Sequence, residues 1–168
     1  MDCHRKDFEI AEELGDKGGV GTAHGNMGNA YYSIGRYQKA IDCHRIALEI
    51  AEELGDRSGI GRGHGNIGNA YHDIGEYKEA MDFHPKDLEI AEELGNKDGV
   101  GRGHANMVSV YFRIGEYEKA IECHCINVEI SEELCDKCAV GRAHGNMGNC
   151  YIGIGQYQKA IDEESQKN

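Results

Sequence analysis

The chain has 168 residues and is strongly acidic, with a formal net charge of −12 and a pI near 5.1. Such a charge disfavours nucleic acids and anionic membrane surfaces as partners, because affinity for phosphates comes mainly from Lys and Arg. No apolar run approaches the roughly 20 residues that span a bilayer, and the N-terminus lacks the apolar stretch of a secretory signal. With seven Cys and no export signal, we expect reduced thiols and a cytoplasmic location.

The sequence repeats itself with a period of 40 residues, and each copy opens with Gly21, Gly61, Gly101 or Gly141. A fixed period of this length is typical of repeat arrays, in which each copy packs mainly against its neighbours. We therefore expect a single array made of a half-repeat, three full repeats and a fourth repeat with a truncated second helix. These segments cover residues 1–20, 21–60, 61–100, 101–140 and 141–168.

In chain order, residues 1–14 are expected to form one helix, which is the second half of a repeat. In the first full copy, apolar or small residues at helical spacing predict a helix over residues 21–34 and a longer helix over residues 37–54. Gly35 and Gly55 should end these helices, because Gly adopts the left-handed conformation that commonly follows a helix. The later copies repeat this pair, so each copy is a helical hairpin.

Three residues are of types that are uncommon in the interior of a helix. Gly25 lies inside the first helix of its copy, where Gly costs about 1 kcal/mol relative to Ala. Gly28 and its counterparts in other copies are expected to let the paired helices approach closely. Pro85 lies inside a second helix, where it removes a backbone hydrogen bond and costs roughly 3 kcal/mol. We expect a kink near residues 81–85.

The spacing His-x2-Met-Gly-x2-Tyr, beginning at His24, and Ala-x3-His, beginning at Ala40, resembles the tetratricopeptide repeat signature. This variety, with NxGNxYxxIGxYxxA followed by EIAEELGD, is similar to the repeats of the Partner-of-Inscuteable, or LGN-type, G-protein-signalling modulators. The resemblance implies an all-α, right-handed superhelix of antiparallel hairpins, an α-solenoid. It also implies a scaffold or adaptor that binds other proteins, with partners in cell polarity or G-protein signalling. No segment resembles the GoLoco motifs of those modulators, so we do not expect their activity here.

A polar stripe follows the first helix of each copy, at steps of four, three and four residues that keep it on one face. It comprises Thr22, Asn26, Asn29 and Ser33, then Arg62, Asn66, Asn69 and Asp73, then Arg102, Asn106, Ser109 and Arg113, and finally Arg142, Asn146, Asn149 and Gly153. By resemblance, the first helices line the concave groove, and the Asn and Arg positions match those that hold an extended peptide. Asn amides both donate and accept hydrogen bonds, and Arg presents a planar fork to carboxylates. Aligned Arg residues in an acidic protein indicate an acidic peptide as partner.

We therefore predict a peptide-binding site on the concave face. It consists of Asn26, Asn29, Arg62, Asn66, Asn69, Arg102, Asn106, Arg113, Arg142, Asn146 and Asn149. The alternative interpretation is structural, with the Asn residues bonded between repeats and the Arg residues paired with nearby Glu. A hypothesis of a different class is a structural array fragment that associates end to end through the half-repeat, using Phe8, Ile10 and Leu14.

The remaining candidate ligands are His and Cys. Two His series, which begin at His24 and His44, occupy positions that pack helices together in the family, so we expect core imidazoles with satisfied hydrogen bonds. Cys135 and Cys138 are weak candidates for metal ligands, because the nearest further pair, beginning at Cys123, lies roughly 10 helical residues or about 15 Å away and zinc needs four converging ligands. No catalytic motif is recognised, and we expect neither enzymatic activity nor a cofactor.

Overall fold

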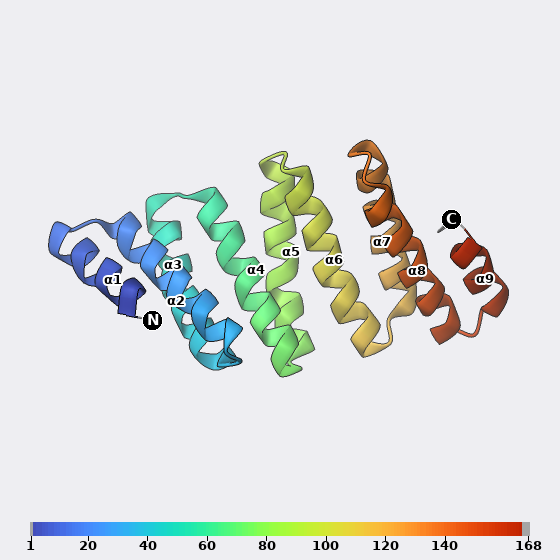
Figure 1. Cartoon of the computed structure of the whole chain (residues 1–168), viewed down its shortest axis with the longest axis horizontal. Helices are drawn as coiled ribbons and strands as arrows, with labels where there is room; N and C mark the ends of the chain where they lie inside the picture. Colours follow the sequence, from blue (N-terminus) through green and yellow to red (C-terminus); the bar gives the residue numbers. More distant parts are fainter. Residues whose placement is uncertain (1, 166–168) are drawn as a thin grey trace. The chain divides into compact units, whose positions relative to one another are not determined.

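The structure is a computed structural model that describes the backbone of residues 2–165 and the side chains of residues 6–165. Its helices are α1 (Asp2–Leu14), α2 (Lys17–Ser33), α3 (Tyr37–Leu54), α4 (Arg57–Ile74), α5 (Tyr77–Glu93), α6 (Lys97–Ile114), α7 (Tyr117–Glu133), α8 (Lys137–Gly153) and α9 (Tyr157–Ser165) (Figure 1). Nothing in the described part of the chain is a strand. The all-α fold predicted from the 40-residue period is therefore confirmed.

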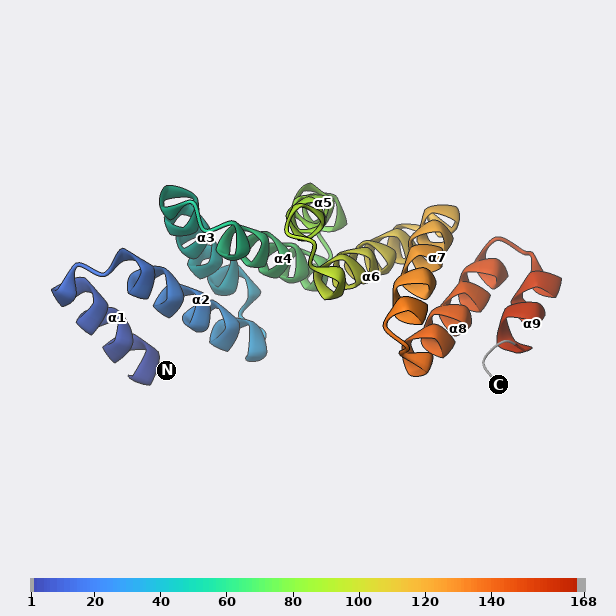
Figure 2. The same cartoon turned by 90° about the horizontal axis from the view of Figure 1, so that it is seen from above.

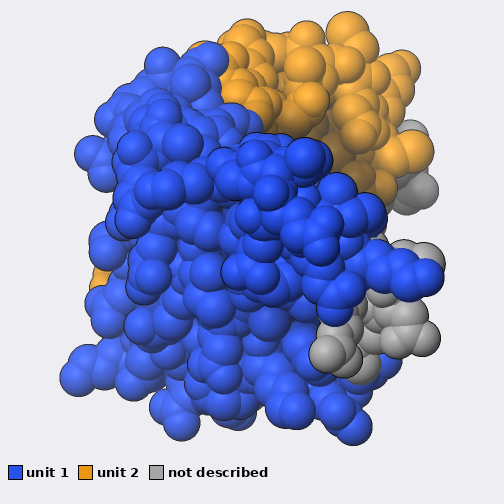
Figure 3. Space-filling model, turned by 90° about the vertical axis from the view of Figure 1, so that its left-hand side faces the viewer, with its two compact units in different colours: residues 1–94 blue, residues 95–168 orange. Residues whose placement is uncertain are grey.

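The chain divides into two compact units, residues 1–94 and residues 95–168 (Figure 3). Within the first unit, α1, α2, α3 and α4 each pack against the helix that follows, up to α5. Within the second unit, α6 to α9 follow the same rule. Neighbouring helices of a unit lie side by side and are joined by short loops (Figure 2). Each unit is thus a stack of helical hairpins.

The first helix of each copy begins earlier than its apolar pattern indicates, at Lys17 instead of Gly21 in the first copy. The cause is an N-cap: the Asp16 carboxylate accepts a hydrogen bond of 2.9 Å from the backbone N–H of Gly19. The same cap recurs at Asp56, Asn96 and Asp136. Such a cap satisfies a backbone donor that has no partner within the helix. It holds the helix start although Gly is a poor helix former.

The helices end as predicted at glycines in the left-handed conformation, with φ of 71° at Gly35 and 69° at Gly55. At Gly55 the backbone N–H bonds to the carbonyls of the last helical turn, which satisfies groups that the helix leaves open. Cys135 occupies the position that is glycine in the other copies. It is the one non-glycine residue with positive φ, 57°, in the described backbone. This position therefore carries backbone strain, because left-handed geometry crowds a Cβ atom.

Paired helices approach closely at glycine, as predicted. A Cβ atom on Gly28 of α2 would lie 2.5 Å from the His44 ring of α3, and one on Gly68 would lie 2.6 Å from the His84 ring. In the last copy the contact is looser, since a Cβ on Gly148 would lie 3.5 Å from its nearest neighbour, the carbonyl oxygen of Ala160. In the first unit, glycine on one helix therefore makes room for the imidazole of its partner.

The imidazoles of the second helices are core residues, but they are not hydrogen-bonded as the sequence suggested. His44, His84 and His124 are 2%, 1% and 5% exposed. Neither ring nitrogen of His84 has a hydrogen-bond partner among the described residues, and the same holds for Nδ1 of His124. Burial lowers the pKa of each of the three rings to about 4. These side chains are therefore neutral at physiological pH, and their flat rings pack in the core much as apolar side chains do.

Pro85 does not divide its helix. The segment α5 runs from Tyr77 to Glu93 with Pro85 inside it. Pro85 itself is exposed, whereas the preceding residue, His84, is buried. The backbone hydrogen bond that Pro85 removes is thus missing on the outer face of the helix. Packing of the opposite face stabilises the helix in spite of this loss.

Exposed ion pairs link the start of a first helix to the end of the second helix in the same hairpin. Lys17 bonds to Glu53 at 3.0 Å and Lys97 to Glu133 at 2.5 Å, and Arg57 pairs with Glu93 in the same way. All these side chains are substantially exposed, so each pair contributes less than about 1 kcal/mol. Their recurrence shows that the hairpins within both units share one construction.

Candidate functional site

A hollow of about 320 Å³ opens in the first unit between α2, α3 and α4. One wall is the stripe of α2, with Asn26 and Asn29, and the other is the stripe of α4, with Arg62 and Asn66. The floor comes from α3, including Ala47 and Ile50. The four predicted stripe residues therefore lie together around one cavity.

A smaller hollow of about 280 Å³ in the same unit shares the lining residues Asn29, His44 and Asn66 with the first. Asn69 also lines it, as does Tyr32. All five residues that the sequence analysis assigned to this part of the stripe thus face one of the two hollows. Helical spacing in the sequence predicted that these residues lie on one face of each helix. The packing of α2 beside α4 then brings the two faces together around the hollows.

The second unit contains a hollow of about 340 Å³ between α6, α7 and α8. The predicted residues Arg102, Arg142 and Asn146 line its walls. Its floor on α7 includes Asn127 and Ile130. The construction repeats that of the first unit at a spacing of 80 residues, with Asn146 corresponding to Asn66 and Ile130 to Ile50.

Three predicted residues do not line any of these three hollows. Asn149 is exposed on α8, and Arg113 is exposed at the end of α6. Asn106 is half-buried, and its amide nitrogen has no hydrogen-bond partner in the described part of the chain. The stripe is therefore continuous in sequence, but only part of it lines these three hollows.

The structural interpretation of the stripe holds in part. The Asn66 amide donates a hydrogen bond of 3.4 Å to Asn29 Oδ1, which joins the first helices of two neighbouring repeats. This distance is beyond the usual range for N–H···O bonds, so the bond is weak. Arg142 lies 4.0 Å from Asp136. Arg62 is exposed and has no ion-pair partner among residues 6–165.

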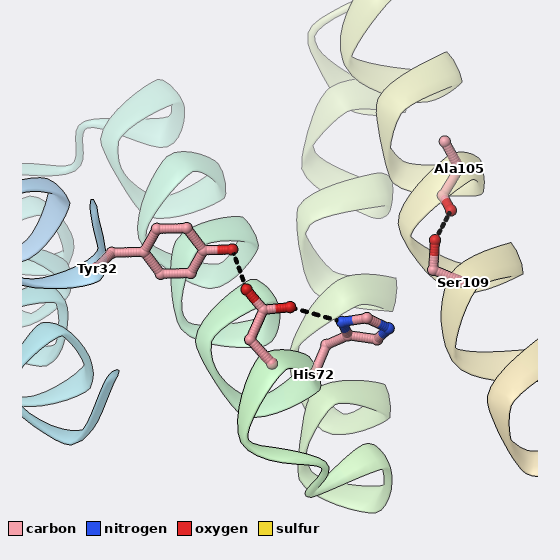
Figure 4. A network of polar contacts seen from close by, with 5 residues as sticks. Tyr32, His72, Ala105 and Ser109 are labelled. Atoms are coloured by element: carbon pink, nitrogen blue, oxygen red, sulfur yellow. Dashed lines mark hydrogen bonds and ion pairs between the residues drawn. The ribbon is translucent and has the colours of Figure 1, made fainter. Parts of the chain in front are cut away.

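A polar network lies at the end of the stripe in the first unit (Figure 4). The Tyr32 hydroxyl on α2 donates a 2.5 Å hydrogen bond to the Asp73 carboxylate on α4, and His72 Nδ1 lies 3.0 Å from the other oxygen of Asp73. Burial, together with the bond to Asp73, raises the pKa of Tyr32 to about 12. Burial by itself would raise the pKa of Asp73, but its bonds with Tyr32 and His72 outweigh that effect and lower it. Asp73 is therefore ionised and holds two neighbouring first helices together.

Ser109, which takes the stripe position of Asn29 and Asn69 in the second unit, has a different partner. The Ser109 hydroxyl donates a 3.1 Å hydrogen bond to the Ala105 carbonyl of its own helix (Figure 4). A hydroxyl turned back on the backbone is a common arrangement within helices. Ser109 therefore does not present its donor to a neighbouring helix.

The hollows are far less negative than the chain as a whole, which has 18 basic and 30 acidic residues. The hollow of the first unit has one cation, Arg62, and one acid, Asp56. The hollow of the second unit has three cations, Lys97, Arg102 and Arg142, against two acids. An anionic ligand would therefore meet less repulsion here than over most of the surface.

Cys135 and Cys138 are exposed, and the described residues contain no group of three or more His, Cys, Asp or Glu side chains that could hold a metal ion. Within the same part of the chain, every helix is too short or too polar to cross a bilayer.

The floor of the hollows was missed by the sequence analysis, which assigned only first helices to the site. The available signal was position 47 and its counterparts at 87 and 127, which read Ala, Asp and Asn on an otherwise apolar helix face. Asp87 is 3% exposed and lies against α4, where a Cβ on Gly65 would be 2.6 Å from its carboxylate. A polar residue at such a position was a reason to include the second helices.

Comparison with known proteins identifies the repeat. The tetratricopeptide repeat family model matches residues 19–93. BtubC (BKLC) from P. vanneervenii is 20% identical, with a TM-score of 0.89 over 98% of this chain and 68% of that chain. A signal transduction ATPase with a tetratricopeptide repeat sensor from Pyrococcus horikoshii is 19% identical, with a TM-score of 0.85 over 95% of this chain and 25% of that chain. A Rap protein complexed with Competence and Sporulation Factor is 18% identical, with a TM-score of 0.70 over 88% of this chain and 41% of that chain. A search of curated proteins found no sequence match.

Residues 19–93 thus match the tetratricopeptide repeat model, and the 40-residue period continues through the second unit. At these identities the likeness to solved structures shows the fold, a tetratricopeptide-like solenoid of helices. The matched region begins close to the observed start of α2 at Lys17.

Proposed function

We propose that this chain is a scaffold or adaptor without enzymatic activity, and that it binds an extended, acidic segment of a partner protein. The observation that supports the proposal is the repeated hollow. In each unit, stripe residues from two first helices border a cavity of about 320–340 Å³ above a second helix. Extended segments bound in helical grooves are a recurrent mode of peptide recognition.

The chemistry of the walls suits such a segment. The amides of Asn26, Asn66 and Asn146 offer both donors and acceptors to a peptide main chain. The guanidinium groups of Arg62 and Arg142, at equivalent positions in the two hollows, suit carboxylates. A hollow of this size accommodates a peptide side chain and lies at the lower end of the range for small-molecule sites. By resemblance to the LGN-type modulators, the partner belongs to cell polarity or G-protein signalling in the cytoplasm.

The test is a selection followed by a titration. Peptides are selected from a random library displayed on phage, using the whole chain as bait, and one enriched peptide is synthesised with a fluorescent label. Its affinity is measured by fluorescence anisotropy for the native chain and for the Arg62→Glu, Arg102→Glu, Arg142→Glu variant. A matched variant, Lys6→Glu, Arg36→Glu, Lys78→Glu, makes the same change in net charge at exposed positions outside the hollows. Circular dichroism confirms that all three proteins have equal helicity.

The proposal expects acidic peptides to be enriched. The groove variant should bind at least about tenfold more weakly than the native chain, and the matched variant should bind nearly as well. Affinity for the native chain should also fall with added salt, because the contacts are partly exposed. Equal losses in both variants would assign the effect to overall charge, and the groove proposal would then fail.

A second candidate function is end-to-end self-association through α1. The observation in its favour is Ile10, which is 55% exposed, whereas Ile90 at the equivalent position of α5 is 5% exposed. In α3 the equivalent Ile50 lies against Gly21 of the preceding helix. Phe8, by contrast, packs on His24 with ring centroids 5.2 Å apart and is not free for such a role. Concentration-dependent mass in light scattering that disappears with Ile10→Glu would support this candidate, and a monomer at every concentration would exclude it.

A further inference from the structure

The two hollows are built from equivalent helices but differ in the residues of their floors. In the first unit the floor positions on α3 are Ala47 and Ala51. In the second unit the equivalent positions on α7 are Asn127 and Ser131. Each pair lies beside an isoleucine and a leucine that do not change, Ile50 and Leu54 in one unit and their counterparts in the other. Two polar side chains thus replace two methyl groups at the bottom of one cavity.

The polar floor contains a side chain whose hydrogen-bonding capacity is not satisfied. Asn127 is half-buried, and its side-chain oxygen is buried without a hydrogen-bond partner in the described part of the chain. The neighbouring residue on α6 is Gly101, where even a Cβ atom would remain 3.8 Å from this oxygen. An apolar ligand group above Asn127 would leave the amide unpaired, which is costly, whereas a ligand N–H can donate to its oxygen and a ligand carboxylate can accept from its N–H groups. The floor of the second hollow therefore disfavours aliphatic side chains.

The walls add a preference among polar groups. The position of Thr22 in the first hollow is occupied by Arg102 in the second, where Arg142 stands on the opposite wall. Two guanidinium groups and an amide around one cavity favour a carboxylate over a neutral or cationic group. The first hollow has a single arginine and a floor of small and apolar residues, which suits an aliphatic side chain.

We propose that the two hollows have different specificities: the first accepts a small or medium aliphatic residue of the bound segment, and the second accepts Asp or Glu. This inference rests on the proposed peptide-binding function and assigns its residue preferences. Asn127 and Ser131 are the specificity-determining residues of the second hollow, and Ala47 and Ala51 are those of the first.

The test exchanges the floors. One variant, Asn127→Ala with Ser131→Ala, gives the second hollow the floor of the first. The reciprocal variant, Ala47→Asn with Ala51→Ser, gives the first hollow the floor of the second and serves as the matched control. The same random phage library is selected on the native chain and on both variants, and paired synthetic peptides that differ only by Glu or Leu at each enriched position are titrated. Urea denaturation followed by circular dichroism checks that each variant is folded.

The inference expects the Glu-over-Leu preference to fall at least about tenfold in the first variant and the Leu-over-Glu preference to fall similarly in the reciprocal one. If Asn127→Ala with Ser131→Ala does not fold, Asn127→Asp replaces it. This change keeps the size of the side chain, and its charge should weaken the binding of acidic peptides by repulsion. Unchanged preferences in the floor variants, with binding still lost in the Arg62, Arg102 and Arg142 variant, would overturn this inference alone. Enrichment of no peptide on the native chain would overturn the proposed function as well.

Discussion

Replacing Gly25 and Gly28 by alanine, one at a time, separates two different roles of glycine within α2. A Cβ atom on Gly25 would meet no other atom within 4 Å, because this position faces the hollow of the first unit. A Cβ atom on Gly28 would lie 2.5 Å from the ring of His44, which is 2% exposed. The two substitutions change the same helix by the same atom, so only their surroundings differ.

The magnitudes follow from these surroundings. Gly25→Ala should stabilise the chain by about 1 kcal/mol, which is the helix-propensity difference between the two residues. Gly28→Ala gains the same amount, but overpacking against a buried ring costs about 1–3 kcal/mol. Because the contact is severe, we expect the upper part of that range and a net loss of about 1–2 kcal/mol. The variants should therefore differ by about 2–3 kcal/mol.

The assay is urea denaturation followed by the helical circular dichroism signal, with midpoints and slopes compared for both variants. Ala105 occupies the position of Gly25 in the second unit, so Ala105→Gly is the matched control and should lose about 1 kcal/mol. If Gly25→Ala and Gly28→Ala shift the midpoint equally and in the same direction, the close approach of α2 and α3 at Gly28 does not hold the hairpin together. That result would refute the packing argument.

Three further predictions concern stability. Cys135→Gly should raise the free energy of unfolding by roughly 1 kcal/mol, because a non-glycine residue in the left-handed conformation costs about 1–2 kcal/mol and the greater conformational entropy of glycine in the unfolded chain offsets part of that gain. The reverse change, Gly95→Cys, should lower the urea midpoint. Unchanged midpoints in both variants would contradict the strain at this position. The buried imidazoles of α3, α5 and α7 have a pKa of about 4, below the unfolded value near 6.5, so the unfolded chain binds more protons between these pH values. The contribution of these neutral rings to stability should therefore be fully present above about pH 7. It should fall as the pH decreases through 6.5 toward 4, with a loss of about 2 kcal/mol per imidazole at pH 5. Urea midpoints that do not change between pH 7.5 and pH 5 would contradict this assignment. Tyr32→Phe removes the donor to Asp73 and should cost about 1 kcal/mol by the same assay, while the control Tyr37→Phe should cost much less, and equal losses would show that the Tyr32 bond is not specific.

The sequence predicted the features that depend on short stretches of chain. The ends of the helices at Gly35 and Gly55 could be read directly, because a left-handed glycine is a local requirement. The hairpin and the face of the stripe followed from apolar spacing within one repeat. Close contact at Gly28 was also predictable, since a small residue recurs there opposite a large ring.

Other features depend on how separate helices pack, and the sequence analysis did not find them. The start of α2 at Lys17 results from the cap at Asp16, which outweighs the low helix propensity of Gly18 and Gly19. The place of Asn127 in the floor of a hollow depends on three helices of the second unit together. The lack of hydrogen-bond partners at His84 could be seen only once the surrounding side chains were placed.

The central claim is that an acidic side chain of the bound segment lies against Arg62 or Arg142, and an exchange of charges tests it most directly. For one selected peptide, each acidic residue is replaced by Lys, and the affinities of the original and replaced peptides are measured for the native chain, for Arg62→Glu and for Arg142→Glu. The account predicts that a Lys-substituted peptide binds the native chain at least about tenfold more weakly and recovers most of this loss on one of the two variants. Loss of binding without recovery on either variant, for every acidic position of the peptide, would contradict the account.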